Sequence, residues 1–181
     1  KTTGVRNCLI EDNVLEAGYA RYARAFNICG GFNQSGVQMC RDNTYRRNRC
    51  YDMNTSSQLY GENNLVYSNV ISYLHNEYTE EGVLFDGNNP QPYAFDTIPW
   101  NDHTSVGNMV INNTFYDVAG AIALHDTADT VYNNLYANNL ITNWTSDTTV
   151  LGIYGGLYDY TNGINYVMNN GFYAEGRTDH I

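Results

Sequence analysis

Short apolar runs of four to six residues, separated by Asn and Gly, recur along this chain. Two examples are "NNLVYSNVISYL" at 63–74 and "NMVINNTFYDVAG" at 108–120. Asn is a poor former of strands and helices and a good former of turns. Its return at one fixed place within each run indicates that the same turn is made repeatedly. No long stretch has a 3.6-residue period, so the pattern predicts short strands and no helices.

The runs align on one Asn, taken as position zero. This Asn occurs six times, at Asn13, Asn48, Asn69, Asn113, Asn139 and Asn170. Five residues before it, five further Asn and one Cys form a second column: Cys8, Asn43, Asn64, Asn108, Asn134 and Asn165. Two apolar columns accompany them. Three residues before zero are Ile10, Tyr45, Val66, Val110, Tyr136 and Val167. Two residues after zero are Leu15, Cys50, Ile71, Phe115, Ile141 and Phe172.

The spacings between zero positions are 35, 21, 44, 26 and 31 residues. Such uneven spacing favours a coil of short strands with variable loops over an α-solenoid or propeller, which keep a tighter period. A further strand-like piece follows in most repeats: "AFNICGG", "SQLYGE", "GVLFDG", "AIALHD" and "VLGIYGG". We expect Ile28, Leu59, Phe85, Leu124 and Ile153 to face inward there. By strand alternation, Cys29, Tyr60, Asp86, His125 and Tyr154 are then expected to face outward in one row.

These segments, "NNxVYxNxI" and "NNTFYDVAGAIALHD" above all, resemble the right-handed parallel β-helix of the pectate-lyase-like superfamily over residues 4–176. The resemblance implies an all-β solenoid of about six coils, with one long loop at 86–104 and stacked Asn amides forming a ladder. It implies a single domain over 1–181. Because neither end carries an obvious cap, we expect a fragment, one domain of a longer chain, or end-to-end self-association.

Charge is distributed unevenly along the chain. Residues 1–50 hold eight Lys or Arg against four Asp or Glu, whereas 51–176 hold fourteen Asp or Glu and neither Lys nor Arg. This acidic part disfavours nucleic acid, anionic lipid and polyanionic glycans as partners, or it is simply a solubilising surface. The longest apolar run is too short for a membrane span. The four Cys, at positions 8, 29, 40 and 50, show no zinc spacing. Either one or two disulfides or buried thiols would fit, and a buried thiol is favoured at Cys50.

The predicted outward row places Asp86 beside His125, with Tyr60 and Tyr154 as flanking residues. An Asp can hold a His in one tautomer and raise its basicity, while Tyr can stack on a sugar or donate a proton. The row is therefore a candidate catalytic set for a lyase, epimerase or glycosidase. The alternative is a surface Asp–His pair in a Tyr-rich protein.

The insertion "DGNNPQPYAFDTIPWNDHT" at 86–104 holds all three Pro and the aromatic residues Tyr93 and Trp100, with His103 near its end. Tyr93, Trp100 and His103 are candidate substrate-binding residues, because loops on a rigid scaffold often carry binding side chains. The alternative is a loop that packs on its own Pro and aromatic residues to cover the coil wall.

No cofactor or metal is predicted, although one acidic set offers calcium-binding oxygens: Glu77, Glu80 and Glu81 with Asp86, beside His75. A charged loop is the alternative. An Arg group could bind a carboxylate or phosphate, or pair with acidic side chains of neighbouring coils. It consists of Arg41, Arg46, Arg47 and Arg49.

The motifs of the superfamily's enzymes are absent. The Arg or Lys bases of its lyases have no counterpart between 51 and 176, and neither "GHG" nor "DPHE" occurs. Three functions remain open. The first is a secreted or cell-surface polysaccharide-processing enzyme acting on a neutral or weakly charged glycan. The second is a non-catalytic glycan-binding or surface module, and the third is a self-assembling scaffold.

Overall fold

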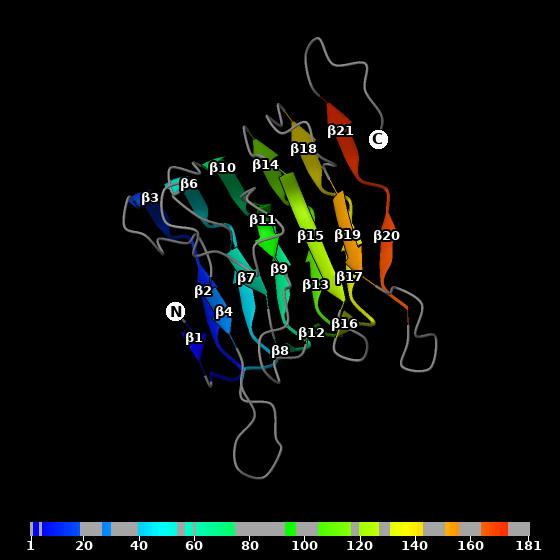
Figure 1. Cartoon of the computed structure of the whole chain (residues 1–181). Coiled ribbons are helices and arrows are strands. Elements are labelled where there is room, and N and C mark those ends of the chain that lie inside the picture. Colours follow the sequence, from blue (N-terminus) through cyan, green and yellow to red (C-terminus); the bar gives the residue numbers. More distant parts are fainter. Residues whose placement is uncertain are drawn as a thin grey trace, which may run out of the picture.

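The computed structural model is all-strand in the part of the chain that it describes. Figure 1 shows the strands crossing the molecule in sequence order, from β3 (blue) at one end to β20 and β21 (red) at the other. Within this part of the chain, no helix is long and apolar enough to cross a membrane. The described residues are 2–3, 5–18, 27–29, 40–53, 57–59, 61–74, 93–96, 105–116, 120–126, 131–142, 151–155 and 164–173.

The described strands form three six-stranded sheets and one three-stranded sheet, and all the neighbouring strands within them run parallel. Sheet A contains β1 (Thr2–Thr3), β4 (Asn27–Cys29), β7 (Ser57–Leu59), β11 (Tyr93–Asp96), β15 (Gly120–Asp126) and β19 (Leu151–Gly155). Sheet B contains β8 (Gly61–Glu62), β12 (Ser105–Val106) and β16 (Val131–Tyr132). Sheet C contains β2 (Leu9–Glu11), β5 (Thr44–Arg46), β9 (Leu65–Tyr67), β13 (Met109–Ile111), β17 (Leu135–Ala137) and β20 (Tyr166–Met168). Sheet D contains β3 (Val14–Gly18), β6 (Arg49–Met53), β10 (Val70–Leu74), β14 (Thr114–Tyr116), β18 (Leu140–Thr142) and β21 (Gly171–Tyr173).

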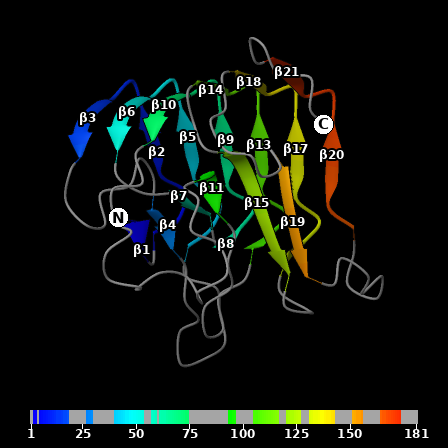
Figure 2. The same ribbon diagram turned by 45° about the horizontal axis from the view of Figure 1, so that its top comes forward.

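The chain visits the sheets in a repeated order. A strand of sheet A is followed by a strand of sheet C and then by a strand of sheet D. In three repeats a strand of sheet B lies between those of sheets A and C. Two residues connect each strand of sheet C to the following strand of sheet D, which gives six C–D strand pairs. Figure 2 shows the strands of sheet A lying in front of those of sheet C. This arrangement of parallel strands fits a parallel β-helix.

The interior between the sheets is filled by the two apolar columns that the sequence predicts. In sheet C the inward residues stay in register from Ile10 to Val167, and in sheet D from Leu15 to Phe172. The four middle members of each column are buried. Each large apolar side chain removed from water contributes about 1.5–3 kcal/mol, so these columns are a main source of stability.

Asn side chains stack in two ladders, one on each side of sheet C. The first ladder runs from Cys8 through Asn43 to Asn165, and the second from Asn13 to Asn170. In the second ladder, the Nδ2 amide of Asn69 donates to Oδ1 of Asn113 at 3.0 Å, and the backbone N–H of Asn69 donates to the same oxygen at 2.9 Å. The same two bonds join Asn64 to Asn108 in the first ladder. The predicted ladder is confirmed, and a second one accompanies it.

The residue before each ladder position takes a left-handed backbone conformation at nearly every turn. Its φ is +54° at Asn63, +55° at Ser68 and +56° at Asn112, and the same place is taken by Gly107 at +65°. Asn enters this conformation more easily than most residues, since its short polar side chain can bond locally. The frequent "NN" dipeptides thus combine two roles: the first Asn makes the turn and the second joins the ladder.

One strand position is assigned wrongly. The sequence pattern places "GVLFDG" between β7 and β15 and puts Tyr93–Asp96 in a long loop at 86–104, but Tyr93–Asp96 occupies the position between β7 and β15 as β11. "GVLFDG" itself lies outside the described residues. Phe95 pairs with Ser57 on one side and with Ile122 on the other. Both segments are short apolar runs, and the pattern alone cannot distinguish which of them reaches the sheet. The other four expected strands of this sheet are present, and Ile28 pairs with Leu59 as predicted.

Candidate functional site

Two of the four predicted catalytic residues lie on neighbouring strands of sheet A. His125 on β15 and Tyr154 on β19 are direct register partners. Tyr60 and Asp86 lie outside the described residues, and the strand expected to carry Asp86 beside β15 is replaced by β11. The described part of the row is therefore a His–Tyr pair.

The predicted loop residues are placed only in part. Tyr93 is the first residue of β11 and pairs with Gly120. Trp100 and His103 lie outside the described residues, as do His75, Glu77, Glu80 and Glu81 of the calcium alternative. Within the part of the chain that is described, no group of three or more His, Cys, Asp or Glu is arranged to hold a metal ion.

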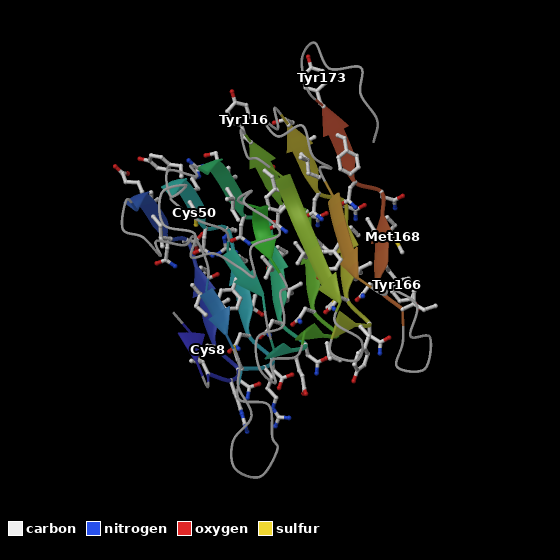
Figure 3. The ribbon with its side chains drawn as sticks, viewed as in Figure 1. Cys8, Cys50, Tyr116, Tyr166, Met168 and Tyr173 are labelled. Carbon is white, nitrogen blue, oxygen red and sulfur yellow. The ribbon has the colours of Figure 1, made fainter. Side chains whose placement is uncertain are left out.

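The outer face of sheet D carries two straight rows of side chains. The first row is Val14, Arg49, Val70, Thr114, Leu140 and Gly171. The second row is Glu16, Tyr51, Ser72, Tyr116, Thr142 and Tyr173. The three Tyr of the second row are exposed, and Figure 3 shows Tyr116 and Tyr173 projecting from the same side of the molecule.

The outer face of sheet C is mostly apolar beyond its first two strands. Its first row is Leu9, Thr44, Leu65, Met109, Leu135 and Tyr166, and its second is Glu11, Arg46, Tyr67, Ile111, Ala137 and Met168. Tyr166 and Met168 are exposed and project from β20 in Figure 3.

Both outer faces lose their charges after the second strand pair. Segments 64–74, 105–116, 131–142 and 164–173, which build the last four pairs, contain no charged residue. The fourteen acidic residues of 51–176 therefore belong to other segments, and the acidic total does not describe these two faces. Side chains that present only apolar and hydroxyl groups suit an uncharged ligand.

Four charged residues of the first two strand pairs form ion pairs. Arg46 Nε and Arg47 Nη2 each lie 2.6 Å from Glu11 Oε2, and Arg47 Nη2 also lies 2.7 Å from Asp12 Oδ2. Hydrogen bonding from Arg47 lowers the pKa of Asp12, and bonding to Glu11 raises the pKa of Arg46. Of the two interpretations of the Arg group, pairing with acidic neighbours therefore holds for these two Arg.

Three of the cysteines are described with their side chains, and two of these are buried. Cys8, Cys40 and Cys50 are free thiols. Burial raises the pKa of Cys50 to about 12, so this thiol stays neutral and unreactive near pH 7, in agreement with the predicted buried thiol. Cys50 fills an inward position of sheet D like an apolar residue.

The Tyr residues of sheet D were missed as candidate residues from the sequence, although the signal is present. Tyr51, Tyr116 and Tyr173 each stand three residues after a second-ladder Asn. The alignment that revealed the ladders therefore contained the row.

Comparison of the chain with protein-family models, curated proteins and solved structures gives no match. The resemblance to the pectate-lyase-like superfamily thus depends on the sequence pattern and on the parallel all-strand architecture with its buried Asn residues.

Proposed function

We propose that this chain is a carbohydrate-active protein that binds a polysaccharide along an outer face of a right-handed parallel β-helix of about six coils. The single observation that carries the proposal is the character of the outer faces. Outward residues of successive strands form straight rows, and in the last four strand pairs these rows bear exposed Tyr and no charge. Long polymers bind best to surfaces that repeat along one direction, and aromatic rings stack on the apolar faces of sugars.

The proposal is tested by measuring binding of the intact chain to a panel of neutral and acidic polysaccharides. We expect retention on neutral glycans and little retention on polygalacturonate, because the chain carries a net charge of −10. Binding to no glycan of the panel would overturn the proposal.

A catalytic role is the second candidate, and the pairing of His125 with Tyr154 favours it. A His can act as a general base and a Tyr as a proton donor in lyase or epimerase chemistry. The test is a screen for new reducing ends and unsaturated products with the wild-type chain, and with His125→Ala as control. A non-catalytic binding module would release no product. A product formed equally fast by His125→Ala would remove His125 from the mechanism.

A further inference from the structure

The Tyr row on sheet D has a regular spacing. Successive register partners along the row are Glu16–Tyr51, Tyr51–Ser72, Ser72–Tyr116, Tyr116–Thr142 and Thr142–Tyr173. Tyr therefore stands on every second strand. Because neighbouring strands lie about 4.8 Å apart, the rings are set about 9–10 Å apart, and the three of them span about 19 Å.

The positions between the rings are occupied by short hydroxyl side chains. Ser72 and Thr142 leave room beside the Tyr rings and offer hydrogen-bond donors and acceptors. Tyr51 is 37%, Tyr116 is 40% and Tyr173 is 63% exposed, so each ring presents surface to solvent. The hydroxyl of Tyr51 donates to the Glu16 carboxylate, which holds the first ring of the row in place.

Sheet C lacks this regularity although it also has outward Tyr. Tyr166 stands alone among Leu, Met and Thr in its row. Tyr67 stands in the other row, and its hydroxyl accepts a hydrogen bond from Arg46 Nη1 at 2.9 Å. A repeating polymer would therefore find a matching repeat on sheet D and not on sheet C.

We propose that Tyr51, Tyr116 and Tyr173 form a stacking platform for an extended, uncharged, β-linked glycan. In such a chain the disaccharide unit repeats at nearly the interval of two strands, so an equivalent sugar face meets a ring at every second residue. The hydroxyl side chains between the rings then face the intervening sugars. This inference depends on the proposed glycan binding and adds the face, the residues and the ligand class.

The experiment measures the affinity of the intact chain for cello-oligosaccharides and xylohexaose by calorimetry. Affinity for cello-oligosaccharides is expected to rise from the disaccharide to the hexasaccharide, which is long enough to reach all three rings. Maltohexaose, an α-linked chain that coils, is the control ligand and is expected to bind at least ten-fold more weakly than cellohexaose. Equal affinity for maltohexaose and cellohexaose would overturn the match to an extended chain.

The variants test the residues. Tyr116→Ala is expected to weaken cellohexaose binding about 5-fold, as removal of one stacked ring does, and Tyr116→Phe is expected to retain most of it. Tyr166→Ala removes an exposed Tyr from sheet C and is expected to bind like the wild type. The melting temperature of every variant is measured and is expected to be unchanged. If the wild type binds but Tyr116→Ala and Tyr173→Ala bind as tightly as Tyr166→Ala, this platform is wrong while the proposed function stands. If no glycan binds to the wild type, both fail.

Discussion

The two Asn ladders differ at their first position, and the difference shows which bonds matter. The second ladder starts with Asn13, whose backbone N–H and Nδ2 both donate to Oδ1 of Asn48, at 3.1 and 2.9 Å. The first ladder starts with Cys8, whose backbone N–H still donates to Oδ1 of Asn43 at 3.0 Å. The hydrogen bond from a side-chain amide is missing at Cys8, yet the turn is the same. The first member of a ladder receives no bond from a preceding amide among the described residues, so a Cys is tolerated at that place.

Inside a ladder the loss of an Asn side chain has a much larger effect. Asn113 accepts both bonds from Asn69 and donates from Nδ2 to the carbonyl of Val66 at 3.0 Å, all in a buried environment. Each buried group left unpaired costs about 1–3 kcal/mol, so we expect Asn113→Ala to lower the free energy of unfolding by roughly 3–5 kcal/mol. Urea denaturation measures it. A loss below about 1 kcal/mol would mean that the ladder does not hold the strand pairs together.

The backbone that accepts hydrogen bonds from the ladder amides is also restricted in its conformation and in the space around it. The carbonyl of Gly61 accepts from Asn108 Nδ2 at 2.9 Å, and Gly61 has a φ of +105°. A Cβ added there would stand 2.0 Å from the carbonyl oxygen of Cys40. We expect Gly61→Ala to lose roughly 2–3 kcal/mol, because both the contact and the conformation are strained.

The control for this variant is Gly107→Ala, which places its Cβ near the side chain of Asn63, a group that can move. The φ of +65° at Gly107 is one that Asn adopts at equivalent turns, so a smaller loss of about 1 kcal/mol is expected. If both variants lose the same free energy of unfolding, the contact with the Cys40 carbonyl oxygen is not what destabilises Gly61→Ala.

The sequence predicted the periodic part of this molecule and not the part that depends on distant pairing. Both Asn columns and both apolar columns are correct, because ladder and interior positions recur at a fixed distance from one turn. The strand assignment between β7 and β15 failed, since the choice between "GVLFDG" and "YAFD" is made by register with strands far away in sequence. The candidate His–Tyr pair was predicted for the same reason that the columns were. Its expected partner Asp86 depended on the strand that was assigned wrongly.

Exchanging the first members of the two ladders tests the opening comparison directly. Asn13→Cys removes two hydrogen bonds that Nδ2 donates at an exposed position, to Asn48 Oδ1 and to the backbone carbonyl of Glu11, and a loss of no more than about 1 kcal/mol is expected. The reciprocal change, Cys8→Asn, adds an amide that can donate to Asn43 and is expected to gain about 0.5–1 kcal/mol. Thermal unfolding of the two variants measures both. A loss of stability in Cys8→Asn, in place of the expected gain, would show that Cys8 has a role that an Asn cannot fill.

A buried hydroxyl provides a contrast to the satisfied amides. The backbone carbonyl of Tyr136 accepts a bond from Asn170 Nδ2 at 3.0 Å, but its side-chain hydroxyl is buried without a hydrogen-bond partner among the described residues. Burial also raises the pKa of this hydroxyl. Tyr136→Phe removes the unpaired group at nearly constant shape, so we expect a gain between zero and about 1 kcal/mol in urea denaturation. A loss above about 1 kcal/mol would reveal an unidentified partner.

The smallest effect on stability is expected at the surface ion pairs of the first two strand pairs. Asp12 bonds to Arg47, which lowers the pKa of Asp12, so its stabilising contribution is present above the unfolded-state pKa of an Asp. That contribution is lost as the pH falls through the lowered value in the folded chain. Asp12→Asn should therefore be slightly less stable than the wild type at pH 7, and the difference should vanish in acid and shrink in high salt, because both groups are exposed. Unfolding curves at several pH values and salt concentrations measure this, and a difference that persists in acid would mean that the Asp12 carboxylate does not act through its charge.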